Sequence, residues 1–292
     1  MTDHLIILAA GASSRMKKSS LSTLSKESID QANNRSKALI MVNDRPMLDY
    51  VLYNAKKAGF KNIYLVIGKD NFLFKEYYGK QESGNNFHGL SISYAYQFIP
   101  KGRNKPMGTA DAVCQALEQY SILQAQKFVV CNCDNLYSTK AFTLLRKSNS
   151  RNAFINYDRD ALQYSQSRIE RFALTKTDPN NYLIDIIEKP SSDTTKNYQD
   201  NKGKFRVSMN IFLFDGTLFY PFLKECSVHF ERNEKELPSA LLQMIKKHSN
   251  TMKGISLSEH VPDLTSKSDI LEMNEYLVSQ QYHIDWTKNN YK

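Results

Sequence analysis

Residues 5–18 read LIILAAGASSRMKK, an apolar run that leads into small residues and then into three cationic side chains. Such a pattern predicts a buried strand that delivers the chain to a turn. The small side chains of Ala10, Gly11 and Ala12 would let backbone N–H groups approach a phosphate at the start of a helix. The stretch contains neither GxGxxG nor GxxxxGK[ST], so it indicates neither a dinucleotide-binding fold nor a Walker-type loop. A strand that ends in a surface turn with solvated lysines fits the same pattern, and the stretch alone leaves both interpretations open.

Apolar runs alternate with helical patterns through the first half of the chain. Four runs predict strands: LIILAA (5–10), NIYLVIG (62–68), SISYAY (91–96) and KFVVCN (127–132). Between them, residues 47–59 and 109–120 repeat their apolar residues at helical spacing. Because alternating strands and helices are typical of βαβ units, we expect an α/β fold with a Rossmann-like, mainly parallel sheet flanked by helices.

From about residue 150 the pattern changes to shorter strands separated by polar turns. These strands are expected in NAFINY (152–157), RIERFAL (168–174), YLIDIIEK (182–189) and FRVSMNIFLF (205–214). They predict a mixed, partly antiparallel lid on the same sheet, and the segment from Leu237 onward predicts a helix, a strand, a loop and a closing helix. Residues 19–36 are polar and rich in small side chains, so we expect a mobile loop there. Neither a repeat nor a Pro/Gly/Ser linker divides the sequence, which favours a single domain over residues 1–292.

The charge of the chain is compatible with several kinds of partner. The 292 residues carry a net charge of +9, and a hydrophobic content of 41% can build a sizeable core. A basic chain can bind nucleic acid, an anionic membrane or phosphorylated small molecules. A nucleic-acid-binding protein is supported by charge alone, because no helix-turn-helix, zinc-finger or aromatic RNA-binding pattern accompanies it.

The spacing of the cysteines and the length of the apolar runs indicate the cellular compartment of the protein. The four cysteines lack the paired CxxC spacing of a zinc site, and we expect reduced structural thiols at Cys114, Cys131, Cys133 and Cys226. The apolar runs are far shorter than the roughly 20 residues that a membrane-spanning helix needs, and the first of them has no cationic leader. We therefore expect a cytoplasmic protein without a membrane partner.

Five motifs follow one another along the chain in the order of a known family. They are LAAGASSRM (8–16) with SKALIMVNDRPMLDYVLYNAKKAG (36–59), then MGTADAV (107–113), CNCDNLYS (131–138), IIEKP (186–190) and VSMNIFLFD (207–215). Together they resemble the nucleotidyltransferase (pyrophosphorylase) superfamily that makes nucleotide sugars, although Ser36 stands where the family usually has Pro. The resemblance implies a GT-A-like nucleotidyltransferase fold. It also implies a nucleotide-binding half over residues 1–150, a sugar-phosphate-binding lid over 151–236 and a C-terminal closing segment over 237–292.

The resemblance implies an Mg²⁺-dependent reaction of the EC 2.7.7 type. In this family a phosphate oxygen of a sugar 1-phosphate attacks the α-phosphorus of a nucleoside triphosphate and releases pyrophosphate. A phosphate whose second pKa is about 6 is already ionised at pH 7, so the reaction needs no general base. It needs cations and positioning instead.

The nucleotide-binding and catalytic residues are carried over from the matching motifs. The resemblance implies a nucleotide site made of Leu8, Ala9, Ala10, Gly11, Ala12, Gln97, Gly108 and Thr109. The implied catalytic residues are Arg15, which would hold the β and γ phosphates, Lys37, which would neutralise charge at the α-phosphorus, and Asp134. A surface lysine at 37 and a turn-capping aspartate at 134 are the structural alternatives. Asp111 fits either a first-turn charge or a contact with the nucleotide.

The sugar-phosphate and metal ligands are implied in the same way. Glu188 would accept hydrogen bonds from sugar hydroxyls, and Lys189 would meet the phosphate; an exposed ion-pairing edge at a strand end is the structural alternative for both. Asn210 would bond the sugar or satisfy a backbone bulge. Asp134 and Asp263 would bind Mg²⁺, because hard carboxylates suit this ion. Asp263 lies in VPDLTSKSDILEMNEYL (261–277), where Lys-Ser replaces the family's Pro-Glu.

Several questions stay open at the level of the sequence. Gln97 and Gly108 resemble the pair that reads uracil in uridylyl-transferring relatives, so UTP is expected first, with dTTP or ATP next. A cytidylyltransferase acting on an alcohol phosphate such as phosphocholine is one alternative. A non-catalytic regulatory protein that binds a nucleotide sugar is another. A homo-oligomer is compatible with the sequence, and no nucleic acid partner is expected.

Overall fold

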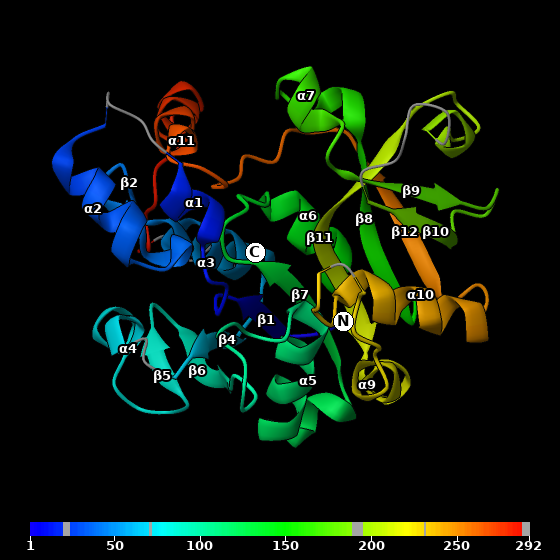
Figure 1. Cartoon of the computed structure of the whole chain (residues 1–292), viewed down its shortest axis with the longest axis horizontal. Coiled ribbons are helices and arrows are strands. Elements are labelled where there is room, and N and C mark those ends of the chain that lie inside the picture. The colour runs from blue at the N-terminus through cyan, green and yellow to red at the C-terminus, as the bar shows by residue number, and fades with distance from the viewer. Residues whose placement is uncertain (20–23, 70–71, 189–194, 231, 288–292) are drawn as a thin grey trace.

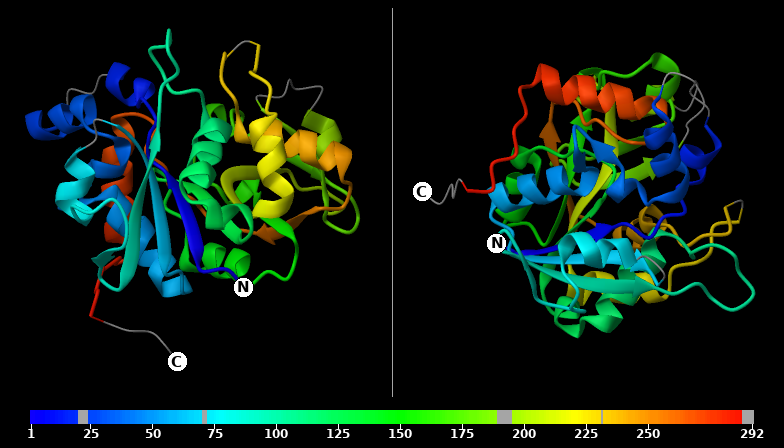
Figure 2. Two further views of the ribbon diagram at one scale, coloured as in Figure 1. Left: turned by 90° about the horizontal axis from the view of Figure 1, so that it is seen from below. Right: turned by 90° about the vertical axis from the view of Figure 1, so that its left-hand side faces the viewer.

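A mixed sheet runs through the molecule, and helices cover both of its faces (Figures 1 and 2). The computed structural model describes residues 1–19, 24–69, 72–188, 195–230 and 232–287. In these ranges the sheet contains ten strands: β1 (His4–Leu8), β4 (Asn62–Gly68), β5 (Asn85–Phe87), β6 (Leu90–Gln97), β7 (Lys127–Asn132), β8 (Asn152–Asp158), β9 (Ala173–Thr177), β10 (Leu183–Ile187), β11 (Arg206–Asp215) and β12 (Met252–Leu257). A separate ribbon pairs β2 (Met41–Val42) with β3 (Arg45–Pro46).

The helices come from all parts of the chain. The α-helices are α1 (Ser14–Lys18), α2 (Lys26–Asn34), α3 (Met47–Ala58), α4 (Phe72–Tyr78), α5 (Thr109–Gln119), α6 (Thr139–Arg146), α7 (Gln166–Ile169), α9 (Gly216–Lys224), α10 (Leu237–Lys247) and α11 (Ser268–Ser279). Short 3-10 helices are η1 (Lys37–Leu39), η2 (Ser121–Gln124), η3 (Arg159–Ala161) and η4 (Lys196–Tyr198). No helix in the described part of the chain is long and apolar enough to span a bilayer.

The centre of the sheet is parallel. Its strands follow the order β10-β9-β11-β7-β1-β4-β6-β5, with β8 placed between β11 and β12. Parallel pairing joins β7, β1, β4 and β6, so that Leu5 lies opposite Ile63 on one side and Val129 on the other. Parallel strands covered on both faces are expected to be apolar throughout, and the four predicted runs are confirmed as these strands. Their carboxyl ends therefore emerge along one edge of the sheet.

The second half of the chain extends the same sheet. β11 pairs antiparallel with β7, β8 and β9, and β12 pairs parallel with β8. This confirms the predicted mixed, partly antiparallel part. The strand predicted over 168–174 is wrong in its first half, because α7 occupies Gln166–Ile169 and β9 begins at Ala173. Over so short a run, alternating apolar residues do not distinguish a helical turn from a strand.

The mobile loop predicted over residues 19–36 is also wrong where the structure describes a helix. Residues 20–23 lie outside the described residues, and α2 covers Lys26–Asn34. The Ser25 side chain caps this helix by accepting a hydrogen bond from the Ser28 N–H at 3.1 Å. Gln31 and Ala32 are buried. A helix with a capped start and a small buried face forms here despite the polar composition.

Two apolar layers hold the helices to the sheet (Figure 2, left). One face is covered by α3, α6 and α11, and the other by α5, α9 and α10. The predicted apolar face of α3 is fully buried, with Leu48 and Val51 in the first layer. All four cysteines are buried free thiols, as expected.

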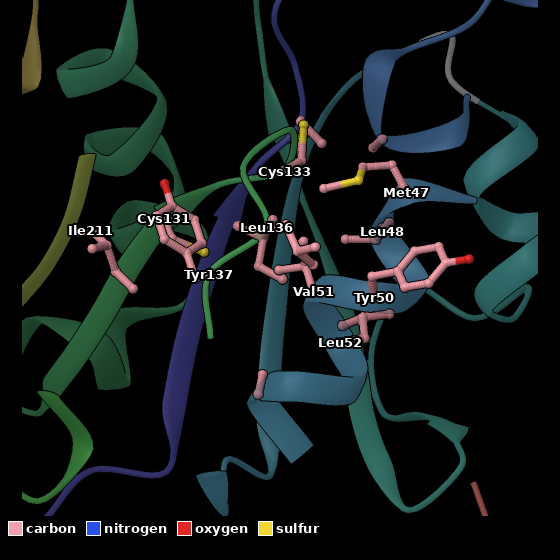
Figure 3. Close-up of a cluster of buried hydrophobic side chains, with 14 of the residues drawn as sticks. Met47, Leu48, Tyr50, Val51, Leu52, Cys131, Cys133, Leu136, Tyr137 and Ile211 are labelled. Atoms are coloured by element: carbon pink, nitrogen blue, oxygen red, sulfur yellow. The ribbon is translucent and has the colours of Figure 1, made fainter. Parts of the chain in front are cut away.

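Tyr137 joins the loop after β7 to a bulge in β11. Its ring lies beside Cys131 (Figure 3), and its hydroxyl donates to the Met209 carbonyl at 2.7 Å. At this point the pairing of β11 with β8 shifts register, and Asn210 adopts a φ of +56° with an exposed side chain. Asparagine tolerates this left-handed conformation better than most residues. Asn210 is therefore the bulge residue of β11.

We expect the Tyr137→Phe variant to lower the free energy of unfolding by about 1–2 kcal/mol, because the Met209 carbonyl loses its buried donor. Tyr157→Phe is the matched control. The Tyr157 hydroxyl is buried and bonds to no described residue, so its removal is expected to be neutral or slightly stabilising. Urea denaturation of both variants measures the difference. Equal losses would contradict the role given to the Tyr137 hydroxyl.

Candidate active site

A cleft with a volume of about 400 Å³ opens at the carboxyl ends of β1, β6 and β7. All of the predicted nucleotide-binding residues line it: Leu8, Ala9, Ala10, Gly11, Ala12, Gln97, Gly108 and Thr109. The predicted catalytic residues Arg15, Lys37 and Asp134 line it as well. The topology thus brings three separate motifs to one place, which is where open α/β sheets bind ligands.

The turn after β1 forms one wall of the cleft. Ala9 still belongs to the sheet, since its N–H donates to the Val66 carbonyl at 2.8 Å. Beyond it, a Cβ added to Gly11 would meet no atom within 4 Å. Gly11 therefore faces open space, and its missing side chain leaves room in the cleft. The chain then passes through Ser13, with a φ of +54°, into α1, whose first-turn N–H groups have no acceptor within the helix.

Cations gather beside this turn. Arg15 on α1 is exposed, and it forms an ion pair with no residue in the described part of the chain. Lys105 lines the cleft from the loop after β6. Arg15, Lys105 and Lys37 all line the cleft, and their positive charge suits an anionic ligand.

Lys37 and Asp134 form an ion pair within the cleft. The Lys37 Nζ lies 2.7 Å from the Asp134 Oδ2, and their side chains are 13% and 20% exposed. Lys37 begins the 3-10 helix η1, and the preceding Ser36 hydroxyl donates to the Ala9 carbonyl at 3.2 Å. Ser36, which replaces the family's usual Pro, thus fastens this segment to the turn after β1.

Gln97 and Gly108 form another wall of the cleft. The Gln97 side-chain Nε2 donates to the Gly108 carbonyl and to the Asp111 Oδ2, each at 2.9 Å. Both partners are acceptors only, so the amide nitrogen has to face them and the amide oxygen points the other way. The Asp111 carboxylate therefore bonds to Gln97 at the base of α5.

A loop from the distant part of the chain closes this wall. The N–H of Lys235 donates to the Met107 carbonyl at 2.6 Å, and the Lys235 carbonyl accepts from Ala110 at 2.9 Å. Glu234 lines the cleft, and Arg103 holds the same loop by donating to the Asn233 carbonyl. Sequence reasoning missed this loop, because no motif or periodic pattern marks it.

Glu188 and Asn210, the two predicted sugar-phosphate residues that the structure describes, do not line the cleft. Glu188 forms an ion pair with Arg232, which also contacts Glu236. Lys189 lies outside the described residues. The Asn210 side chain is exposed at the bulge of β11. Their roles in binding a sugar phosphate stay predictions.

The backbone segments that carry Asp263 and Asp134 lie side by side, but the Asp263 side chain bonds to other residues. The N–H of Leu264 donates to the Asp134 carbonyl at 2.8 Å. The Asp263 carboxylate bonds to the guanidinium of Arg168 on α7, and Tyr164 donates to it at 3.1 Å. Burial raises the pKa of the Asp263 carboxyl, Arg168 opposes this shift, and the carboxylates of Asp134 and Asp269 add to it.

The residues fit part of a magnesium site. Asp134 presents a carboxylate on the cleft wall, which is the kind of ligand that Mg²⁺ prefers. Among the described residues, no three His, Cys, Asp or Glu side chains converge to hold a metal. Asp134 would therefore be the anchoring ligand, with phosphate oxygens and water completing the shell. The Asp263 carboxylate is bound by Arg168. The assignment of Asp263 as the second metal ligand therefore stays a prediction.

The cleft of this α/β protein combines a small-residue turn, cationic side chains, a carboxylate and a fixed amide at the carboxyl ends of parallel strands, a lining that suits a phosphate-bearing ligand. Comparison with known families identifies the class of protein. A family model described as "Nucleotidyl transferase" matches residues 5–280, and the chain belongs to this family.

Individual relatives are distant. The chain is 24% identical over 248 residues to the bifunctional protein GlmU of Methanococcus vannielii, covering 84% of this chain and 50% of that protein. It is 24% identical over 289 residues to GlmU of Staphylococcus epidermidis, covering 98% and 54%. The chain thus spans about half the length of the curated relatives it matches. A crystal structure of UDP-glucose pyrophosphorylase complexed with UDP-glucose shares the fold, with a TM-score of 0.70 at 14% identity over 96% of this chain and all of that one.

We expect Gly11→Ala to fold like the wild type and to bind a nucleoside triphosphate at least about tenfold more weakly, because the added methyl projects into the open cleft. Gly108→Ala is the contrasting variant. Its φ is +107° and an added Cβ would lie 2.4 Å from the Lys235 carbonyl oxygen, so it is expected to lose about 1–3 kcal/mol of stability. Calorimetry and equilibrium binding separate the two effects. Wild-type affinity in Gly11→Ala would contradict the placement of the nucleotide.

Proposed function

We propose that this chain is a sugar-1-phosphate nucleotidyltransferase that couples a nucleoside triphosphate, UTP by preference, to a sugar 1-phosphate. The products are a nucleotide sugar and pyrophosphate. The observation that carries the proposal is the ion pair between Lys37 and Asp134, which lines the same cleft as the turn after β1. The family membership and the names of the relatives support the same reaction class.

The proposed reaction is an in-line displacement. An oxygen of the sugar phosphate attacks the α-phosphorus, a new P–O bond forms, and the bond to the bridging oxygen of pyrophosphate breaks with its electron pair on the leaving group. The backbone of the turn after β1 holds the nucleotide, Arg15 holds the β and γ phosphates, and Lys37 balances the charge that gathers at the α-phosphorus. When bound at Asp134, Mg²⁺ supplies a Lewis acid for the phosphate oxygens.

The preference for UTP rests on the orientation of Gln97. With its amide nitrogen bonded to Gly108 and Asp111, the amide oxygen is the group left to accept a hydrogen bond. Uracil and thymine carry such a donor at N3, flanked by carbonyl oxygens that a backbone N–H of Gly108 can serve. Adenine has no N–H at the corresponding ring position, so we place dTTP second and ATP third.

Both proposed substrates, the nucleoside triphosphate and the sugar 1-phosphate, are charged, and we propose that the protein works in the cytoplasm.

A pyrophosphate-release screen tests the proposal. The four ribonucleoside triphosphates and dTTP are each combined with a panel of sugar 1-phosphates and with phosphocholine, in the presence of Mg²⁺ or of EDTA. We expect release with UTP and a sugar 1-phosphate, and none in EDTA. Release only with CTP and phosphocholine would identify a cytidylyltransferase. A silent panel together with tight binding of a nucleotide sugar would identify a regulatory protein.

We expect Asp134→Ala to lower kcat/KM at least about 100-fold, because the cleft loses its metal-binding carboxylate and Lys37 loses its partner. Asp3→Ala is the matched control. Asp3 pairs with Arg146 at 2.6 Å near the amino-terminal end of β1, away from the cleft, so this variant should keep wild-type rates. Equal rates in the wild type and Asp134→Ala would contradict a catalytic role for this carboxylate.

We expect Asp111→Asn to reduce the preference for UTP over CTP about tenfold, since an asparagine can donate as well as accept and no longer dictates the direction of the Gln97 amide. Glu118→Gln, an exposed change on the same helix, is the control and should leave the preference unchanged. Competition between the two nucleotides in one reaction measures the ratio. An unchanged ratio in Asp111→Asn would show that the amide does not select the base.

A further inference from the structure

Lys267 is a buried lysine whose ammonium group is bound by backbone carbonyls. The residue is 3% exposed. Its Nζ donates to the carbonyls of Met16 at 2.9 Å, Lys17 at 3.2 Å and Ser19 at 2.7 Å. An ammonium has three donors, and here all three are satisfied. No carboxylate pairs with this charge among the described residues, so the carbonyl dipoles at the end of α1 stabilise it.

A second contact joins the same two segments. The backbone N–H of Lys267 donates to the Ser19 hydroxyl at 3.0 Å, and that hydroxyl donates to the Met16 carbonyl at 2.9 Å. Figure 1 shows α1 beside the start of α11, two elements that stand at opposite ends of the chain. Lys267 and Ser19 together therefore clamp the carboxyl end of α1 to the segment before α11.

The clamp matters because α1 cannot hold its own position. A helix of five residues is far too short to be stable alone, so its place is set by tertiary contacts. Met16 is fully buried and its carbonyl accepts from Lys267. Arg15 directly precedes Met16, so the clamp acts one residue away from the exposed guanidinium in the cleft.

The segment that carries Lys267 is itself rigid and is tied to Asp134. The buried Asp269 carboxylate accepts from the N–H groups of Thr265 at 2.7 Å and Ser266 at 2.6 Å. It also binds Arg168 at 2.6 Å. At the start of this segment, Leu264 donates to the Asp134 carbonyl at 2.8 Å. Residues 264–267 thus connect Asp134 to the end of α1.

We propose that Lys267 is a positioning residue that fixes Arg15 relative to Asp134 and thereby sets the affinity for the nucleoside triphosphate. The proposal rests on the proposed nucleotidyltransferase function, since it uses the roles assigned there to Arg15 and Asp134. Lys267 is buried and lines no part of the cleft, so it acts through α1 and not by touching substrate.

The test uses the full chain with Lys267→Met, which keeps an unbranched side chain as far as the ε position and removes the ammonium. We expect the KM for the nucleoside triphosphate to rise about tenfold, while the KM for the sugar 1-phosphate changes less than about threefold. We also expect faster tryptic cleavage after Arg15, Lys17 and Lys18, because the end of α1 is released. A purely structural role would lower the melting temperature and leave the ratio of the two KM values unchanged.

Two further variants complete the design. Lys127→Met is the matched control. The Lys127 Nζ also donates to a backbone carbonyl, that of Ser150 at 2.7 Å, but it lies at the amino-terminal end of β7, away from the cleft. It should change neither KM nor cleavage within α1. Ser19→Ala removes only the hydroxyl of the clamp, and it should shift the nucleotide KM in the same direction by a smaller factor even if Lys267→Met does not fold.

The outcomes separate this inference from the proposed function. If the wild type releases pyrophosphate with none of the substrate pairs, the proposed function fails before any variant is compared. The inference then fails with it. If the wild type is active and both Lys267→Met and Ser19→Ala keep the wild-type KM for nucleotide, the positioning role is overturned and the proposed function stands.

Discussion

The ion pair between Lys37 and Asp134 is the contact on which the candidate site depends. Its partners are 97 residues apart in sequence, and they meet because β1 and β7 are parallel neighbours whose carboxyl ends lie at one edge of the sheet. The turn after β1 is fixed to the same place through Ser36 and Ala9. A cation and a carboxylate held beside an open turn provide what transfer at a phosphorus requires, which is charge compensation in a fixed geometry.

Two loops that come from distant parts of the chain complete the site. The loop around Lys235 is bonded to both sides of Gly108, where only a glycine fits. The segment that holds Lys267 ties α1 to the strand end that carries Asp134. The walls of the cleft are therefore positioned by hydrogen bonds between segments that are far apart in the sequence. Arg168 forms an ion pair with Asp263, which directly precedes this segment.

Much of the fold could be predicted from the sequence, because buried parallel strands are apolar throughout and their periodicity is local. The motifs that resemble a family predicted one shared site for the turn after β1, the Gln97 wall and the Asp134 loop. The helix α2 was missed because its polar composition hid a serine cap and a small buried face. The contacts of Glu234, Arg168 and Lys267 could not be predicted, since each joins segments that are close only in three dimensions. The register shift at Asn210 agrees with the backbone bulge, which was one of the two alternatives for this residue in the sequence.

The most direct test of the central claim is the stereochemistry of transfer at the α-phosphorus. A single diastereomer of UTP carrying sulfur on the α-phosphorus is converted with a sugar 1-phosphate, and the configuration of the product is read by ³¹P NMR. The account predicts one pyrophosphate for each nucleotide sugar formed and inversion at phosphorus, as required by one in-line displacement within a preformed cleft. Retention of configuration would show a covalent nucleotidyl-protein step and would contradict the account, as would hydrolysis of the nucleotide without transfer to the sugar phosphate.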